Sequence, residues 1–213
     1  MIMMTKKKRA ALIGEVFDEV YSDAKCSLDY DTEHQLLVAV QLSAQCTDAR
    51  VNIVTKTLFQ KYRTVSDFAN AALEELEEFV RPCGFYRNKA KNIIESSRTI
   101  LEKHNGCLPD TMEELTALAG VGRKTANLIL GDVFGKPCIV VDTHCIRLSN
   151  RMGLVETTDP VKIEMELKKI VNPMSSARLC HQLVYHGRAV CTARSPKCAE
   201  CPVKHLCKSA PKE

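Results

Sequence analysis

The short segment 120–122, Gly-Val-Gly, separates two runs of helical periodicity and constrains the fold more than any other part of the chain. Apolar residues recur at helical spacing before it, over 112–119, and after it, over 126–133. Gly120 and Gly122 permit positive φ and leave the first N–H groups of the second helix uncovered. Uncovered N–H groups at the positive end of a helix attract phosphate. The pattern therefore predicts a helix-hairpin-helix that binds a DNA backbone.

Arg123 and Lys124 fall in the first turn of the expected second helix. We expect Arg123 to contact DNA phosphate. The helix dipole disfavours an ammonium here and so favours the free amine of Lys124. Lys124 also lies about 200° around the helix from Ala126, which places it outside the core. A free amine beside a bound sugar-phosphate predicts Schiff-base chemistry. The alternative is a simple phosphate contact by Lys124.

Asp142 follows the apolar run 138–141 and precedes another helical pattern. An aspartate in that place is commonly an N-cap, which is one interpretation of Asp142. The other interpretation is a carboxylate that works with Lys124, eighteen positions earlier in the chain.

Four cysteines near the carboxyl end form the pattern C-x6-C-x2-C-x5-C within seventeen residues, and these are Cys191, Cys198, Cys201 and Cys207. Four thiolates so close together can surround zinc or an iron–sulfur cluster. Zinc sites usually combine two C-x2-C pairs, whereas this pattern has one, and the residues alone leave both zinc and an iron–sulfur cluster open. The spacer after Cys191 should become a rigid loop that presents Arg194 and Lys197 to phosphate. Solvated charge is the alternative for both residues.

The chain has eleven cysteines, and an odd number cannot all pair within one chain. We expect the seven outside the cluster to be reduced thiols that serve as small core residues. These seven are Cys26, Cys46, Cys83, Cys107, Cys138, Cys145 and Cys180.

The composition favours a mostly helical protein, because 45% of the 213 residues are hydrophobic and the polar residues are rich in Lys and Glu. A net charge of +4 is too small to establish nucleic-acid binding by itself. No apolar run approaches the roughly 20 residues that span a bilayer. Glu15 and Asp18 argue against a transit peptide. We expect no membrane partner and a cytoplasmic, nucleoid-associated protein.

The chain shows no convincing strand and no clear internal repeat, which predicts one all-α body with one or two lobes. Residues 1–9 are interpreted as a frayed basic start, and Asp48 is expected to cap the third helix. Outside the hairpin, the expected helices are 10–21, 34–45, 49–62, 65–72, 73–80, 90–104, 143–152, 159–171 and 175–188.

Several motifs together resemble the endonuclease III family of DNA glycosylase/lyases, over residues 10–208. They are GVGRKTA followed by VDTH, LSAQCTD, GFYRNKA and the carboxyl-terminal cysteine spacing. Two positions depart from the family pattern: Ala119 stands where Pro is usual, and Phe85 where Leu is frequent.

The resemblance implies a helix-hairpin-helix DNA glycosylase fold. A six-helix barrel would span 24–135, and a second lobe would combine 1–23 with 136–213. It also implies a four-iron four-sulfur (4Fe-4S) cluster held by the cluster cysteines. The implied partner is double-stranded damaged DNA, bound by a monomer.

By motif, Lys124 would be the nucleophile and Asp142 its acidic partner. Gln45 would fill the space left by an extruded base, and Phe85 would wedge into the duplex. His144 would line the pocket, or hold the helix start as a structural residue.

The implied activity is removal of oxidised or ring-saturated pyrimidines in base excision repair, followed by strand cleavage at the abasic site. One alternative is a monofunctional glycosylase for mispaired or alkylated bases, which the presence of Lys124 disfavours. Another is a non-catalytic DNA-binding redox module, which would leave Lys124 and Asp142 without a purpose.

Overall fold

The computed structural model describes residues 4–211, and within that range it contains helices and loops but no strand. The predicted all-α class is therefore confirmed over the described residues. The chain divides into two compact units, one of residues 27–134 and one that joins 1–26 to 135–213. We call them the hairpin unit and the cluster unit, after the motifs they carry.

The hairpin unit contains seven α-helices and one 3-10 helix among its described residues. They are α2 (Glu33–Ser43), α3 (Asp48–Lys61), α4 (Val65–Ala69), α5 (Leu73–Val80), η1 (Arg81–Cys83), α6 (Tyr86–Lys103), α7 (Met112–Ala117) and α8 (Arg123–Asp132).

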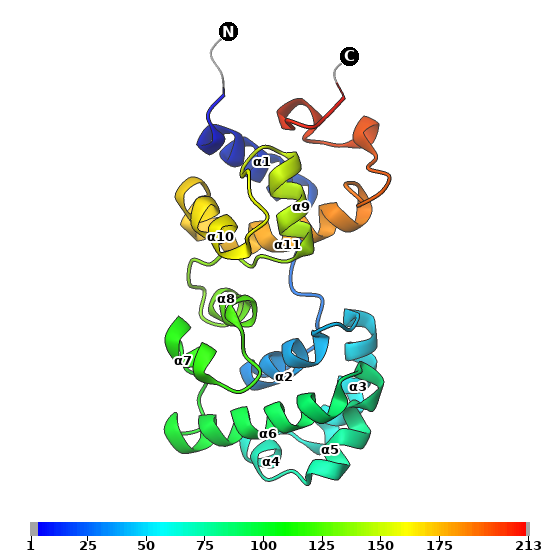
Figure 1. Ribbon diagram of the computed structural model, residues 1–213, viewed down its shortest axis with the longest axis vertical. Coiled ribbons are helices and arrows are strands. Elements are labelled where there is room, and N and C mark those ends of the chain that lie inside the picture. The colour runs from blue at the N-terminus through cyan, green and yellow to red at the C-terminus, as the bar shows by residue number, and fades with distance from the viewer. Residues whose placement is uncertain (1–3, 212–213) are drawn as a thin grey trace. The chain divides into compact units, whose positions relative to one another are not determined.

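Helix α2 is the centre of the hairpin unit and packs against α3, α6 and α8 (Figure 1). Its residues 34–42 are all buried, as expected for a helix that is apolar around its circumference. Thr32 caps its first turn by accepting a hydrogen bond from the backbone N–H of Gln35. At the other end, the Gln41 side chain donates to the carbonyl of Ala119 at 2.8 Å. The central helix thus holds the turn between α7 and α8.

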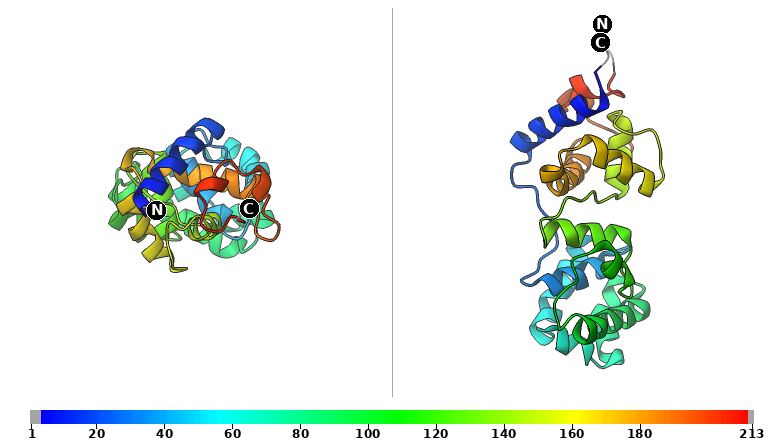
Figure 2. Two further views of the ribbon diagram at one scale, coloured as in Figure 1. Left: turned by 90° about the horizontal axis from the view of Figure 1, so that it is seen from above. Right: turned by 90° about the vertical axis from the view of Figure 1, so that its left-hand side faces the viewer.

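The cluster unit contains α1 (Lys6–Val20), α9 (Thr143–Arg151), α10 (Pro160–Ile170), η2 (Pro173–Ser175), α11 (Ser176–Ala189), η3 (Cys198–Glu200) and η4 (Lys204–Leu206). Its core joins the two ends of the chain, since Phe17 of α1 packs with Leu148, Leu183 and Leu206. Figure 2 shows α1, in dark blue, beside the carboxyl-terminal segment, in red, and α1 contacts η4.

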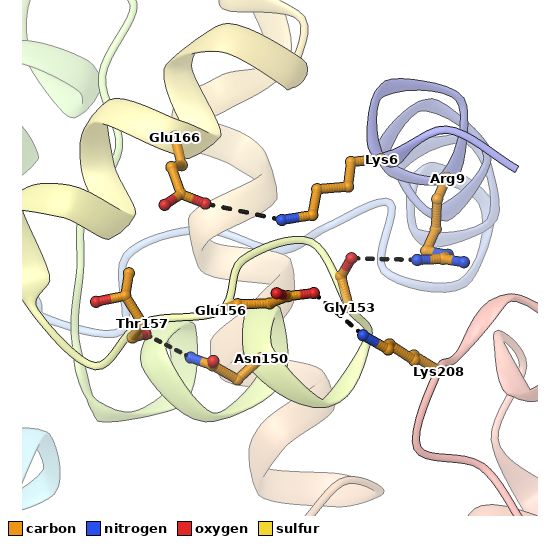
Figure 3. Close-up of polar contacts among 8 residues, drawn as sticks. All are labelled: Lys6, Arg9, Asn150, Gly153, Glu156, Thr157, Glu166 and Lys208. Carbon is orange, nitrogen blue, oxygen red and sulfur yellow. Dashed lines mark hydrogen bonds and ion pairs between the residues drawn. The ribbon is translucent and has the colours of Figure 1, made fainter.

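The loop after α9 is tied to both ends of the chain by polar contacts (Figure 3). Arg9 donates to the carbonyl of Gly153 at 3.1 Å, and Lys208 pairs with Glu156 at 3.1 Å. Gly153 has a φ of 72°, and a Cβ there would lie 2.8 Å from the Lys208 side chain, so the loop requires glycine at this point. These contacts hold the carboxyl-terminal segment against α1 and α9.

Three expectations about helix starts are wrong, and local capping or backbone conformation explains each one. Helix α1 begins at Lys6 and not at residue 10, because Thr5 accepts a hydrogen bond from the N–H of Lys8. Thr47, not Asp48, caps α3. Helix α6 begins at Tyr86, four residues before its expected start.

None of the eleven cysteines, all of which lie in the described residues, forms a disulfide. Four of the seven outside the cluster are buried, as expected: Cys83, Cys138, Cys145 and Cys180. Burial raises the pKa of Cys145 to about 12, so this thiol stays protonated. The expectation is wrong for Cys107, which is exposed, and only partly right for the half-buried Cys26 and Cys46. Over the described residues, no helix is long and apolar enough to cross a membrane.

Candidate functional site

The turn between α7 and α8 is built around Gly120. Its φ is 72°, and a Cβ added there would lie 2.8 Å from the Asn92 side chain of α6. A residue with a side chain would therefore meet both backbone strain and a steric clash. Before the turn, Thr111 caps α7 by accepting from the N–H of Glu114 at 3.2 Å.

Gly122 is the N-cap of α8 and has a φ of −94°, so of the two glycines that permit a positive φ only Gly120 adopts it. No side chain caps the first turn of α8, and a Cβ at Gly122 would meet no atom within 4 Å. The start of α8 is therefore accessible to an anion.

Arg123 and Lys124 are the first two residues of α8. Lys124 is exposed, which confirms that it points away from the core, and Arg123 is half-buried. Lys124 thus presents its amine close to the uncapped helix start. The hairpin unit contains Lys124, whereas Asp142 belongs to the cluster unit, and the pairing of the two stays a prediction.

Asp142 caps helix α9. Its Oδ1 accepts a hydrogen bond from the backbone N–H of Cys145 at 2.7 Å, and the side chain is half-exposed. This is the structural role considered for Asp142 from the sequence. The cap occupies one carboxylate oxygen and fixes the side chain at the helix start, which leaves the carboxylate charge available for chemistry.

His144 lies in the first turn of α9 against the backbone of α11. Its Nδ1 is 3.1 Å from a guanidinium nitrogen of Arg147, and a Cβ at Gly187 would lie only 2.3 Å from the same Nδ1. Glycine at 187 therefore makes room for the imidazole. These contacts favour the positioning role for His144 that the sequence left open.

Gln45 and Phe85 share an unusual backbone conformation. Both are exposed and lie in the left-handed region, with φ of 54° and 47°. Only one other non-glycine residue among the described positions, Asn105, has a positive φ. Phe85 is 65% exposed, although burial of an aromatic side chain is normally favourable. Bulky residues held in this region indicate a functional constraint.

The four carboxyl-terminal cysteines line one cavity of about 130 Å³. Burial, together with the neighbouring thiols, raises the pKa of Cys201, as expected where several thiolates would repel one another. A cationic metal centre removes that repulsion. No group of three or more His, Cys, Asp or Glu side chains between residues 4 and 211 is arranged to hold a metal ion. Four thiols around a cavity fit a metal cluster better than one ion.

Arg151, in the last turn of α9, holds the segment that begins with the first cluster cysteine. Its guanidinium donates to Cys191 Sγ at 3.3 Å, to the carbonyl of Thr192 at 2.7 Å and to that of Ala193 at 2.8 Å. Arg147, one turn earlier, donates to the carbonyl of Cys191 at 3.1 Å. Sequence reasoning missed both arginines, although their i, i+4 spacing on one helix was a usable signal.

His186 links the cavity to helix α1. The imidazole is buried, its Nδ1 lies 2.8 Å from the Tyr21 hydroxyl, and its Nε2 lies 3.6 Å from Cys201 Sγ. Burial lowers the pKa of His186 to about 4, so the ring is neutral. A proton donated by Tyr21 to Nδ1 leaves the Nε2 proton directed at the cysteine sulfur. Sequence reasoning also missed this residue.

Arg194 and Lys197 are exposed on the loop between the first two cluster cysteines. The loop is closed by the Thr192 hydroxyl, which donates to the carbonyl of Ser195 at 2.7 Å, and by the Lys197 N–H, which donates to the carbonyl of Val190 at 3.0 Å. Both cations are therefore displayed on an ordered loop, and their contact with phosphate stays a prediction.

Comparisons with known proteins match most of this chain. Residues 38–173 match the HhH-GPD superfamily base excision DNA repair protein family, and residues 191–207 match the iron–sulfur binding domain of endonuclease III. Endonuclease III of Synechocystis sp. (strain PCC 6803) is 49% identical, with 98% of this chain and 95% of that protein covered. Endonuclease III of Bacillus subtilis (strain 168) is 46% identical, with 98% and 96% covered.

A solved structure of a trapped endonuclease III–DNA covalent intermediate superimposes with a TM-score of 0.90. It is 43% identical in sequence, and the match covers 98% of each chain.

Proposed function

The chain belongs to the endonuclease III family of helix-hairpin-helix base excision repair enzymes, which are DNA glycosylases and AP lyases, and we propose how its residues divide that work. The substrate is double-stranded DNA with an oxidised or ring-saturated pyrimidine or an abasic site, bound by one copy of the chain. The observation that carries this proposal is the exposed Lys124 at the uncapped start of α8, directly after the hairpin turn.

Binding begins at the DNA backbone. The helix start after Gly122 binds a phosphate at the positive end of α8, and Arg123 adds a fixed charge. Arg194 and Lys197 contact a second stretch of backbone from the cluster loop. Because these contacts involve no base, they position the enzyme without selecting a sequence.

Extrusion of the damaged nucleotide follows. Phe85 enters the stack as a wedge, and Gln45 occupies the space that the base leaves, where its amide can hydrogen-bond the opposite base. Both side chains are already exposed in the conformation that presents them. Extrusion costs least at a lesion whose stacking or pairing is already weak, which contributes to selectivity.

Lys124 and Asp142 carry the chemistry. The Lys124 amine attacks the anomeric carbon of the deoxyribose, and the carbon–nitrogen bond to the base breaks as the base leaves with the electron pair. The Asp142 carboxylate stabilises the positive charge that develops on the sugar and transfers protons. His144 positions the start of α9, where Asp142 is the cap.

The covalent intermediate is an imine between Lys124 and the sugar. The imine acidifies the adjacent carbon, so loss of a proton there expels the 3′ phosphate by β-elimination and cuts the strand. Water then hydrolyses the imine and regenerates the amine. This route accounts for glycosylase and lyase activity with one nucleophile.

The cofactor is a 4Fe-4S cluster, and we assign Cys191, Cys198, Cys201 and Cys207 as its ligands. When bound, it supplies four iron–sulfur bonds that crosslink a segment without helical periodicity. The segment can then keep the shape that displays Arg194. The cluster therefore has a structural role in DNA binding.

Borohydride trapping tests the proposed function. It reduces the imine to a stable amine, so wild-type protein mixed with duplex DNA that contains thymine glycol should yield a covalent complex. Lys124→Gln should yield none, whereas Lys103→Gln, a change at an exposed lysine at the end of α6, should trap like wild type. Equal trapping by Lys124→Gln and wild type would refute the assignment of the nucleophile.

A further inference from the structure

Two loops of the hairpin unit carry the residues that we assign to enter DNA. One loop, residues 43–46, begins at the last residue of α2 and contains Gln45. The other, residues 83–85, begins at the last residue of η1, precedes α6 and contains Phe85. We call them the probe loops. Each holds its exposed residue in the left-handed region, a conformation that persists only where the surroundings enforce it. Some part of the fold must therefore fix the two loops.

The side chain of Lys89 connects these loops from inside the unit. Lys89 is 6% exposed, and its Nζ donates to the carbonyl of Leu42 at 2.9 Å and to the carbonyl of Cys83 at 2.8 Å. Leu42 lies in the last turn of α2, directly before the first loop, and Cys83 begins the second. Burial, and then the neighbouring Cys46 of the first loop, raise the pKa of the Cys83 thiol, so the same loops also meet at this point.

Burial of an ammonium group is energetically unfavourable, because the charge loses its hydration. Desolvation lowers the pKa of Lys89, which measures the penalty on its charged form. Its two acceptors are carbonyls at the carboxyl ends of α2 and η1, where helix dipoles favour a cation. An apolar side chain of similar volume would pack without that penalty, but it could not bind two carbonyls. The hydrogen bonds to the two carbonyls are therefore the contribution of Lys89 that an apolar side chain could not replace.

We propose that Lys89 is a positioning residue that ties the two probe loops together, so that Gln45 and Phe85 enter the duplex as one unit. The inference rests on the proposed function, which assigns those two side chains to nucleotide extrusion. Lys89 lies in the first turn of α6, only four residues after Phe85, and the carbonyl of Leu42 is three residues before Gln45. A shift of the Lys89 ammonium therefore moves both probe residues. Lys89 acts through them and has no assigned contact with the reacting sugar.

Lys89→Met tests the tie, because methionine has a similar length but cannot bind a carbonyl. Extrusion is followed by the fluorescence of 2-aminopurine next to a thymine glycol, and cleavage is followed under single-turnover conditions. A misplacement of about 1 Å can cost on the order of 100-fold in rate, which is the loss expected for Lys89→Met. The fluorescence rise should be lost in parallel. The matched control is Lys103→Met, which removes the same charge about 21 Å along α6 and should behave as wild type.

A double-mutant comparison separates this role from general destabilisation. In a protein that already carries Gln45→Ala and Phe85→Ala, no probe side chain remains to be positioned. Lys89→Met should then change the rate by less than about 3-fold, because its effect acts through the missing side chains. A further loss of about 100-fold in that background would show a merely structural role and overturn the inference.

Three other outcomes are informative. If Lys89→Met does not fold, Lys89→Gln, which keeps a donor at a shorter reach, replaces it in the same comparison and should show a smaller coupled loss. An active wild type with an equally active, equally fluorescent Lys89→Met would overturn this inference alone. A wild type that neither cleaves nor traps damaged DNA would overturn the proposed function, and this inference with it.

Discussion

Replacing Asp142 by asparagine and by alanine separates the helix cap from the chemistry assigned to the same side chain. The Asp142 Oδ1 accepts from the N–H of Cys145 at 2.7 Å, and an asparagine oxygen can accept the same hydrogen bond. Alanine cannot, and loss of an N-cap costs about 1 kcal/mol. That loss lowers the melting temperature of a protein of this size by roughly 2–4 °C. Asp142→Asn should therefore melt like wild type, and Asp142→Ala should melt earlier.

Catalysis should respond differently, because it needs the carboxylate charge and not the cap. Removal of a charge that stabilises a transition state costs on the order of 100-fold in rate, so both variants should lose glycosylase activity to this extent. Thermal unfolding by circular dichroism measures the cap, and single-turnover base release from duplex DNA with thymine glycol measures the chemistry.

Asp159 provides the matched control. It caps α10 by accepting from the N–H of Lys162 at 2.8 Å, and it is exposed. Asp159→Ala should therefore lower the melting temperature like Asp142→Ala but keep full activity. An Asp142→Asn protein with wild-type activity would refute the reasoning and reduce Asp142 to a cap.

Three further predictions follow from buried or strained positions. Burial lowers the pKa of His34 from 6.5 to about 4, so its contribution to stability is present above pH 6.5 and is lost as the pH falls toward 4. Between pH 6.5 and 4, the free energy of unfolding measured with urea should fall more steeply for wild type than for His34→Gln, by up to about 1.4 kcal/mol per pH unit. Equal dependence of this free energy on pH in the two proteins would contradict the prediction. Gly120→Ala should destabilise by about 1–3 kcal/mol through its φ of 72° and the clash with Asn92, and an unchanged urea midpoint would count against it. Arg151→Met removes the donor to Cys191 Sγ and should speed the loss of visible absorbance under an iron chelator, whereas an unchanged rate would exclude that role.

Helical periodicity predicts the elements of this chain well, because each amphipathic run buries one face in a local core. Helical periodicity does not predict the first residue of a helix where a capping side chain or an unusual backbone conformation sets the helix start. Helix α1 extends back to Lys6 because Thr5 caps it, although three lysines suggested a frayed start. Helix α6 begins directly after the strained Phe85, a conformation that no propensity favours.

Site residues that belong to local motifs could be predicted from the sequence, whereas residues that act through tertiary contacts could not. Lys124, Asp142 and the cluster cysteines can be found from the sequence, because the turn, the cap and the spacing are local features. Lys89 could not, since its partners are backbone carbonyls without a side-chain signature, and one of them, that of Leu42, lies far away in sequence. The sequence also does not fix the φ of Gly122, because a glycine turn permits several conformations.

The identity of the residue that becomes attached to DNA tests the account most directly. After borohydride reduction of wild-type protein with DNA that contains an abasic site, proteolysis and mass spectrometry locate the modified amine. The account predicts a reduced sugar adduct on Lys124. An adduct on another lysine, or on the terminal amine, would contradict it.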